Sequence, residues 1–334
     1  MQPKRTTATR VRAARSAGFT VIELLTVVSI IALLVAILVP SLHKARDQAK
    51  NVKIRAIMHT LDTGLGLFKN ENEDEFRSTN GYPPSARGDD PHEWNLTYTI
   101  PRGTMYGAHW LVRYLVGLDQ QGVVQRRAVP PELKDNTKEW YKPDATDDGP
   151  LPRVGPYVPL DAVELVPTNQ LRGQRSATID EKLVAPVVGD VFGYPILYYV
   201  ANPHGRVIST PTSAPDDKGR RGVYVQEDNA GFTGSDQGLI SGVGWHFRPG
   251  QEEDHVLRKF GNPDPGLIDK DQRDRSFTYY ICDRKVLDQT DPDGRRPEGR
   301  TVKPYRPDTY LLISAGKDGL YGTPDDITNF DRSE

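Results

Sequence analysis

A long apolar segment near the start of the 334-residue chain dominates the pattern of hydrophobic and polar positions. Nineteen residues from Leu24 to Leu42 carry no formal charge, and a helix of that length, rising ~1.5 Å per residue, crosses a bilayer core. Residues 1–18 before it contain no acid and five cations, namely Lys4, Arg5, Arg10, Arg12 and Arg15. The pattern predicts a basic leader over residues 1–18 and a membrane-spanning helix over residues 19–42.

After Pro40 the apolar residues recur at helical spacing. Steps of three and four residues place such positions on one face of a helix. Two adjacent stripes run along residues 43–70: Ala45, Ala49, Val52 and Ala56 form the first, and Ile54, Ile57, Leu61, Leu65 and Phe68 form the second. We therefore predict one helix from Phe19 to about Phe68, whose amphipathic second half packs on a sheet through both stripes.

We predict that residues 71–334 form a globular domain. Glycine and paired prolines at 81–84 end the long helix, and helical spacing predicts a second helix over 106–116. Residues 120–182 are rich in Pro, Gly, Asp and Lys, which favours an irregular surface insertion. Strand patterns follow at 187–188, 196–200, 222–226, 277–282 and 309–314, with loops at 202–221 and 261–275. The whole predicts an α+β fold: a long helix on a C-terminal antiparallel sheet with large loop insertions, chiefly between about 203 and 302.

Composition excludes several classes of protein. The net charge is −2, and loss of the five leader cations would make it −7, so no basic excess indicates nucleic acid as a partner. The single cysteine, Cys282, rules out an intrachain disulfide, and we expect it to be a small buried side chain on a strand. Despite its apolar helix the chain has a mean hydropathy of −0.58, so the remainder is strongly polar.

Signatures of catalysis are missing from the sequence. The seven histidines show no paired spacing typical of zinc, and Gly234-Ser235-Asp236-Gln237-Gly238 has its serine in the wrong place for a nucleophile elbow. Tyr198-Tyr199 and Tyr279-Tyr280 suit either a carbohydrate-stacking surface or the packing of a core, and packing is the commoner use of such pairs. We therefore expect a protein that is not an enzyme.

Glu23 raises a burial problem. A carboxylate inside the membrane, near the end of a spanning helix, raises the free energy of insertion by ~2.5 kcal/mol or more unless a partner neutralises it. A cut after Gly18 would create a free α-amine at Phe19, four residues from Glu23, on the same chain or on a neighbour. The alternative is an ordinary signal anchor that happens to carry an acid.

Gly18-Phe19-Thr20-Val21-Ile22-Glu23-Leu24-Leu25, behind a short basic leader, resembles the processing site of type IV prepilins and type II secretion pseudopilins. The resemblance implies cleavage after Gly18 by a prepilin peptidase and methylation of the new amino terminus at Phe19. It implies that Glu23 pairs with the terminal amine of an adjacent subunit. Pro40, the twenty-second residue after the cut, matches a helix-kinking proline that is common in these proteins.

Two shorter segments resemble major pseudopilins of type II secretion. Gly81-Tyr82-Pro83-Pro84 is similar to the Gly-x-Tyr-Pro that follows their long helix, and Asp190-Val191-Phe192-Gly193-Tyr194-Pro195 to the Asp-Pro-Trp-Gly-x-Pro that opens their sheet. Val191 and Phe192 depart from the Pro and Trp of that pattern. The turn geometry is expected to remain.

The loop from Ser314 to Phe330 carries carboxylates and hydroxyls on a glycine-punctuated turn, the hard oxygen ligands that Ca²⁺ prefers. The spacing is not that of an EF-hand. The loop resembles the carboxy-terminal calcium loop of major pseudopilins, which implies Asp318 and Asp326 as ligands, with Asp325 as the alternative. An Asp/Gly turn without an ion is the competing interpretation.

The resemblance also implies a location, which charge alone leaves open because cations flank the apolar segment on both sides. We expect a single-pass protein of a bacterial inner membrane, with a cytoplasmic amino terminus, a periplasmic domain over residues 71–334, and a periplasmic or surface filament after assembly.

The expected function is that of a structural subunit of a type II secretion pseudopilus. The implied partners are the prepilin peptidase, other pilin or pseudopilin subunits, an assembly platform membrane protein, an ATPase and membrane lipid.

Two alternatives remain for the function. One is a major or minor type IV pilus subunit that serves adhesion, motility or DNA uptake. The other is a membrane-anchored ligand-binding or enzymatic domain that uses a pilin-type leader.

Overall fold

The computed structural model describes residues 19–86, 88–89, 104–117, 120–136, 139–171, 185–233, 255–261, 276–283 and 302–330. The chain divides into two compact units, residues 1–49 and residues 50–334. The expected leader, the Ser235 segment and most of the loop at 261–275 lie outside the described residues. The predicted long helix is confirmed as α1, Val21–Asn72.

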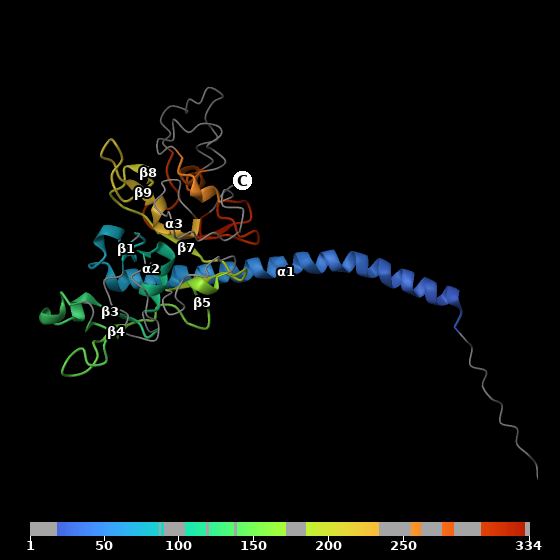
Figure 1. Cartoon of the computed structure of the whole chain (residues 1–334), viewed down its shortest axis with the longest axis horizontal. Helices are drawn as coiled ribbons and strands as arrows, with labels where there is room; N and C mark the ends of the chain where they lie inside the picture. Colours follow the sequence, from blue (N-terminus) through green and yellow to red (C-terminus); the bar gives the residue numbers. More distant parts are fainter. Residues whose placement is uncertain are drawn as a thin grey trace, which may run out of the picture. The chain divides into compact units, whose positions relative to one another are not determined.

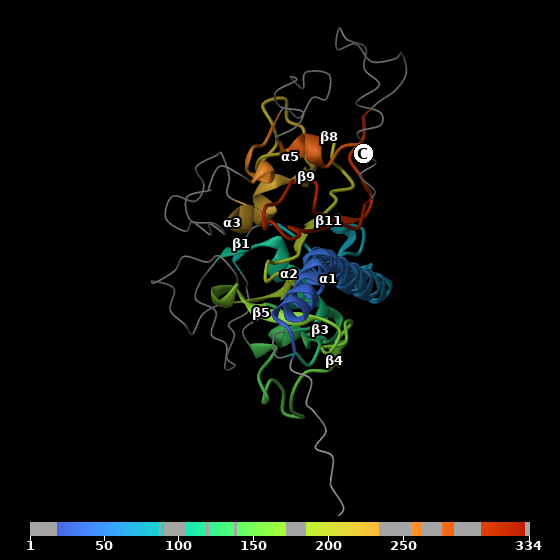
Figure 2. The same cartoon turned by 90° about the vertical axis from the view of Figure 1, so that its right-hand side faces the viewer.

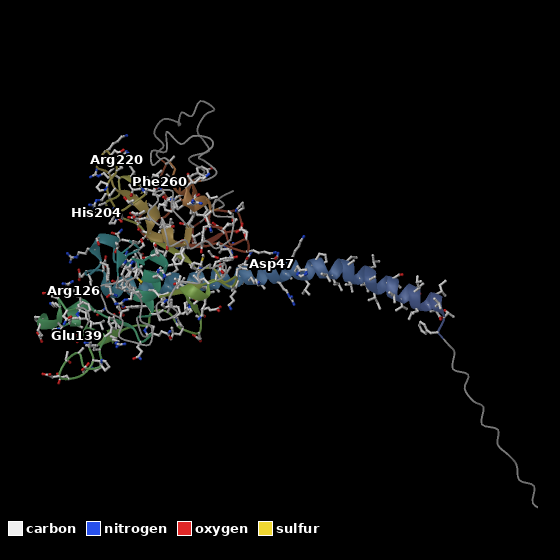
Figure 3. All side chains as sticks on the ribbon, in the orientation of Figure 1. Asp47, Arg126, Glu139, His204, Arg220 and Phe260 are labelled. Carbon is white, nitrogen blue, oxygen red and sulfur yellow. The ribbon has the colours of Figure 1, made fainter. Side chains whose placement is uncertain are left out.

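In the first unit, α1 presents its apolar side chains outward. Every residue from Phe19 to Leu42 is exposed, and Figure 3 shows their side chains projecting on all sides of the ribbon. The helix continues through Pro40. An apolar helix of this length forms without a protein partner around it because each backbone N–H and C=O, apart from those at the ends and at the proline, is satisfied within the helix.

In the second unit, only one of the two predicted stripes is buried. Ile54, Ile57, Leu61, Leu65 and Phe68 join the main hydrophobic core, together with Met58. The other stripe is exposed at Val52 and Ala56, so the prediction that both stripes pack was wrong. A helix has room for one core-facing side of roughly 100°, and the larger side chains occupy it.

Gly64 allows α1 to approach the backbone at Tyr157 and Val158 closely. A Cβ atom there would overlap Cγ2 of Val158 and lie 3.1 Å from the carbonyl oxygen of Tyr157. Phe68, one turn further on, packs edge-on against the rings of Tyr157 and Tyr114. Tyr114 belongs to α2, Gly107–Leu115, which confirms the predicted second helix.

A three-stranded antiparallel sheet, in the order β11-β10-β7, forms the centre of the domain. β7 covers Leu197–Val200, β10 covers Tyr310–Ser314 and β11 covers Ile327–Thr328. Tyr310 pairs with Val200 and Ile313 with Leu197, and all residues of β7 and β10 are buried. These two strands confirm the predictions at 196–200 and 309–314.

The remaining strands in the described part of the chain form separate two-stranded pairs. The antiparallel pairs are β1 (Gly88–Asp89) with β2 (Thr104–Met105), β3 (Val123–Val124) with β4 (Arg153–Val154), and β5 (Glu164–Pro167) with β6 (Pro186–Gly189). β8 (Val207–Thr210) and β9 (Gly222–Val225) are parallel. The region 120–182 thus contains short strands, and the expected loop at 202–221 contains β8, which corrects both predictions.

The predicted strand at 277–282 is instead a short helix, α5, Phe277–Tyr280. The hydroxyl of Ser276 accepts a hydrogen bond from the N–H of Tyr279 at 3.4 Å and so caps its first turn. Cys282 follows α5 as an isolated bridge to Pro304 and is buried, as expected, though not on a strand. Within the described residues, the other short helices are α3 (Ala230–Thr233) and the 3₁₀ turns η1 (Arg77–Thr79), η2 (Arg126–Ala128), η3 (Pro131–Leu133), η5 (Thr168–Gln170), η6 (Gln226–Asn229) and η7 (Val256–Arg258).

The elements of the second unit gather around α2 and the central sheet. Figures 1 and 2 show β3, β4 and β5 on one side of α2, and β8, β9 and α5 on the other. The tyrosine pairs lie inside: Tyr198 and Tyr199 are fully buried, and Tyr279 and Tyr280 are nearly so. Their interpretation as core packing is therefore confirmed, and they form no exposed stacking surface.

Candidate functional site

Glu23 lies at the first turn of α1, where it forms a capping box with Thr20. Its Oε2 atom accepts hydrogen bonds from the N–H of Thr20 at 2.8 Å and from the Thr20 hydroxyl at 2.7 Å. The Thr20 hydroxyl in turn accepts from the N–H of Glu23 at 3.3 Å. This reciprocal arrangement satisfies N–H groups that the start of a helix leaves unpaired. The capping role was not part of the sequence prediction, although Thr-x-x-Glu is its signature.

Two further polar side chains of the apolar segment are satisfied by the backbone of the helix. The hydroxyl of Thr26 donates to the carbonyl of Glu23 at 2.9 Å, and that of Ser29 donates to the carbonyl of Leu25 at 2.7 Å. Such bonds hide a hydroxyl from lipid. Oε1 of Glu23, by contrast, accepts no hydrogen bond from the residues that the structure describes, so it keeps capacity for another donor.

The segment around Glu23 is apolar and uncovered. The 18-residue window of highest hydropathy in α1 averages 2.9 and is entirely exposed, and among the described residues α1 is the one helix long and apolar enough to cross a membrane. The predicted processing residue Phe19 is exposed at the start of this segment, while Gly18 lies outside the described residues. An apolar surface of this size requires lipid or other helices around it.

The C-terminal loop after β10 brings Asp318 and Asp325 together. Oδ2 of Asp325 accepts from the N–H groups of Lys317 at 2.9 Å and Asp318 at 3.0 Å, and its Oδ1 accepts from the Thr323 hydroxyl at 2.6 Å. Asp318 accepts from the N–H of Leu320 at 2.8 Å. The predicted convergence of Asp318 with one later aspartate is confirmed, and the partner is Asp325.

The two carboxyl groups influence each other's protonation. Burial raises the pKa of Asp318, and the neighbouring Asp325 carboxylate raises it further. Burial acts upward on the pKa of Asp325 as well, but hydrogen bonds from Thr323 and from two backbone N–H groups outweigh it and lower that pKa. A cation beside the pair would relieve the repulsion between the two carboxylates.

Asp326 has a different environment. Its Oδ2 accepts hydrogen bonds from the hydroxyl of Tyr280 and, at 2.7 Å, from the N–H of Gly322. Asp326 is buried, whereas Asp318 is half-buried and Asp325 is exposed. The structure therefore places Asp326 in a supporting role for the loop and favours Asp325, the alternative, over Asp326 as the companion of Asp318.

The segment at Asp190 supports the same loop, a contact that the sequence did not predict. Oδ1 of Asp190 accepts from the N–H groups of Phe192 at 2.8 Å and Tyr194 at 3.0 Å, which fixes the turn between β6 and β7. Its Oδ2 accepts from the hydroxyl of Ser314 at 2.6 Å, at the end of β10. Gly319 approaches the ring of Tyr194 so closely that a Cβ there would overlap it. The turn geometry expected at 190–195 is confirmed.

Within the described part of the chain, no three His, Cys, Asp or Glu side chains form a group suited to a metal ion. The C-terminal loop offers two carboxylates, and Ca²⁺ accepts backbone carbonyls and water as its further oxygen ligands. The donor set is that of a hard cation, which fits calcium better than zinc.

Comparison of the chain with protein-family models, curated proteins and solved structures gives no significant match.

Proposed function

We propose that this chain is a structural subunit of a type II secretion pseudopilus, which polymerises through α1 after its leader is removed. The observation that carries the proposal is the uncovered apolar half of α1 with Glu23 as its single charge between Phe19 and Leu42. In a filament, neighbouring helices would cover that surface, and the methylated amine of Phe19 on one subunit would donate to Glu23 of the next.

Several features support this interpretation over that of an inert anchor. Thr26 and Ser29 are satisfied within the helix, whereas Oε1 of Glu23 retains a free acceptor position beside the proposed new amino terminus. In this proposal the partner proteins carry out the catalysis. A prepilin peptidase removes the leader, and an assembly ATPase acts with a platform protein in the bacterial inner membrane. The chain itself supplies shape and contacts and no catalysis, with its domain on the periplasmic side.

The processing step has a direct test. Intact-mass measurement of the protein extracted from its native membrane should give a chain that begins at Phe19 and carries one added methyl group. Replacement of Gly18 by a bulky residue, Gly18→Leu, should leave the leader attached and the protein in the membrane. A mature cellular pool that still begins at Met1 would overturn the proposal.

We further propose that the loop at Asp318 and Asp325 holds Ca²⁺ in the periplasm. Both carboxylates would bind the ion, Asp326 would fix the loop through Tyr280 and Gly322, and Asp190 would fix the end of β10 through Ser314. When bound, the ion supplies positive charge that allows two adjacent carboxylates to remain ionised.

A type IV pilus subunit with the same polymerisation mechanism is the nearest alternative, because its leader and helix would look the same. It differs in the location of the filament. Filaments on the cell surface under native expression would favour the pilus, and filaments confined to the periplasm would favour the pseudopilus.

A further inference from the structure

A pocket of about 250 Å³ lies beside β7, β8 and β9, and its lining shares no residue with the start of α1 or with the C-terminal loop. Figure 1 shows β8 and β9 side by side next to α3, with β7 below them. The wall combines apolar residues, which include Pro84, Val200, Val223 and Val225, with hydroxyl-bearing and charged ones. Pockets for drug-sized molecules usually have volumes of ~300–1,000 Å³, so this one suits a smaller ligand.

Asp228, in η6, lines the pocket and has one oxygen without a partner. Its Oδ2 accepts a hydrogen bond from the hydroxyl of Ser85, and Ser85 is held by the N–H of Val200 at 3.0 Å. Its Oδ1 is buried and makes no hydrogen bond. Asp228 as a whole is 3% exposed. A buried carboxylate oxygen without a donor is costly, and a ligand that donates to it would remove the cost.

The protonation of Asp228 shows how strongly its position disfavours an unpaired charge. Burial raises the pKa of Asp228 to about 7, with a further upward contribution from Glu227, and the Ser85 hydrogen bond opposes both. An ammonium group at Oδ1 would favour the ionised carboxylate. The described lining contains no second acid, which argues against a divalent cation, because such ions take several oxygen ligands.

Arg221 supplies the opposite charge at the exposed edge of the pocket. It immediately precedes β9, and alternate residues of a strand share a face, so Arg221 lies on the same face as Val223 and Val225. Arg221 is exposed and forms no ion pair with a described acid, whereas its neighbour Arg220, labelled in Figure 3, is paired with Asp216 at 2.7 Å. A free guanidinium at the rim selects for a ligand with a carboxylate.

We propose that this pocket binds a free amino acid with an apolar side chain, its ammonium group on Asp228 and its carboxylate on Arg221. Val200, Val223 and Val225 then contact the side chain. The proposal stands whether or not the chain polymerises, since the pocket lies entirely within residues 50–334.

Calorimetry on the purified full chain in detergent tests the proposal with three matched probes. L-leucine carries both charges, isoamylamine lacks the carboxylate, and 4-methylpentanoate lacks the ammonium group. We expect L-leucine to bind at least tenfold more tightly than either single-charge probe. Equal binding of all three, or no heat for L-leucine at millimolar concentration, would overturn the proposal.

Two variants assign the ends of the ligand. Asp228→Asn keeps the size of the side chain and should weaken L-leucine at least tenfold while leaving 4-methylpentanoate unchanged. Arg221→Gln should weaken L-leucine and 4-methylpentanoate while leaving isoamylamine unchanged. Asp217→Asn, at an exposed acid outside the lining, is the control and should change none of the three affinities. Full L-leucine binding by Asp228→Asn would contradict the assigned role of the carboxylate.

Discussion

Oε2 of Glu23 accepts hydrogen bonds from both the backbone N–H and the hydroxyl of Thr20. Glu23, which we predict to pair with the terminal amine of a neighbouring subunit, therefore also caps its own helix. Thr20 would be the second residue of the processed chain, so its N–H and hydroxyl survive the proposed cut after Gly18. Because the cap needs an oxygen and the filament contact needs a negative charge, substitutions can separate the two roles.

Glu23→Gln is the decisive substitution, because glutamine serves a capping box as glutamate does but carries no charge. We expect Glu23→Gln and Glu23→Ala to remain in the membrane and both to be lost from filaments. Thr20→Ala keeps the charge and removes the hydroxyl, at a cost of ~1 kcal/mol to the helix end, and should still assemble. Electron microscopy and fractionation of sheared filaments measure the outcome; normal fibres from Glu23→Gln would leave only the cap as the role of Glu23.

Gly64 and Gly66 provide a matched pair for the packing of α1 in the second unit. A Cβ at Gly66 meets no atom within 4 Å, so Gly66→Ala should raise the free energy of unfolding by up to ~1 kcal/mol through helix propensity. A Cβ at Gly64 overlaps Val158, so Gly64→Ala should lower it by ~1–3 kcal/mol. Thermal unfolding of both variants measures this contrast, and equal stabilisation by both would refute the close approach to Val158.

Calcium should raise the melting temperature of the full chain, because the ion binds the folded loop and relieves the repulsion between Asp318 and Asp325. Asp318→Asn and Asp325→Asn should each abolish the rise. Asp161→Asn, at an exposed acid outside the loop, should retain it. The same melting temperature with calcium and with a chelator in the wild-type chain would count against the site.

Asp228 predicts a dependence of stability on pH. Its pKa rises from 3.8 when unfolded to about 7 when folded, so the folded state holds the proton more tightly. The stability that this proton contributes is complete below pH 3.8 and is lost as the pH rises through 7, with a total on the order of 4 kcal/mol. Asp228→Asn should therefore gain stability relative to the wild-type chain between pH 5 and pH 8, as measured by denaturant unfolding. A constant difference across that range would be inconsistent with the raised pKa.

The sequence predicts the parts of this fold whose signal is local. The uncharged run and the stripe from Ile54 to Phe68 define α1, and aromatic and β-branched residues define β7 and β10. β8 was missed because apolar and polar residues do not alternate in Val207-Ile208-Ser209-Thr210. Its partner β9 is parallel to it and is separated from it by a loop, so no short hairpin signal marks the pair. The segment at Phe277 has strand-forming residues, but burial on all sides and the Ser276 cap make it a helix.

For the candidate sites, too, the sequence predicts the local motifs and not the contacts that depend on the fold. A motif of eight consecutive residues identifies the start of α1, but only the folded structure shows that Thr20 and Glu23 cap this helix together. For the C-terminal loop, the sequence proposes three aspartates as candidate calcium ligands. The choice between the adjacent Asp325 and Asp326 depends on the direction each side chain takes from the turn, toward Asp318 or toward Tyr280, and no spacing rule contains that information.

Isolation of native filaments, followed by mass spectrometry of their subunits, decides whether this chain polymerises after its leader is removed. We expect the filaments to contain this chain, beginning at a methylated Phe19. Filaments from which it is absent, or a working form that is an unprocessed monomer beginning at Met1, would contradict this expectation.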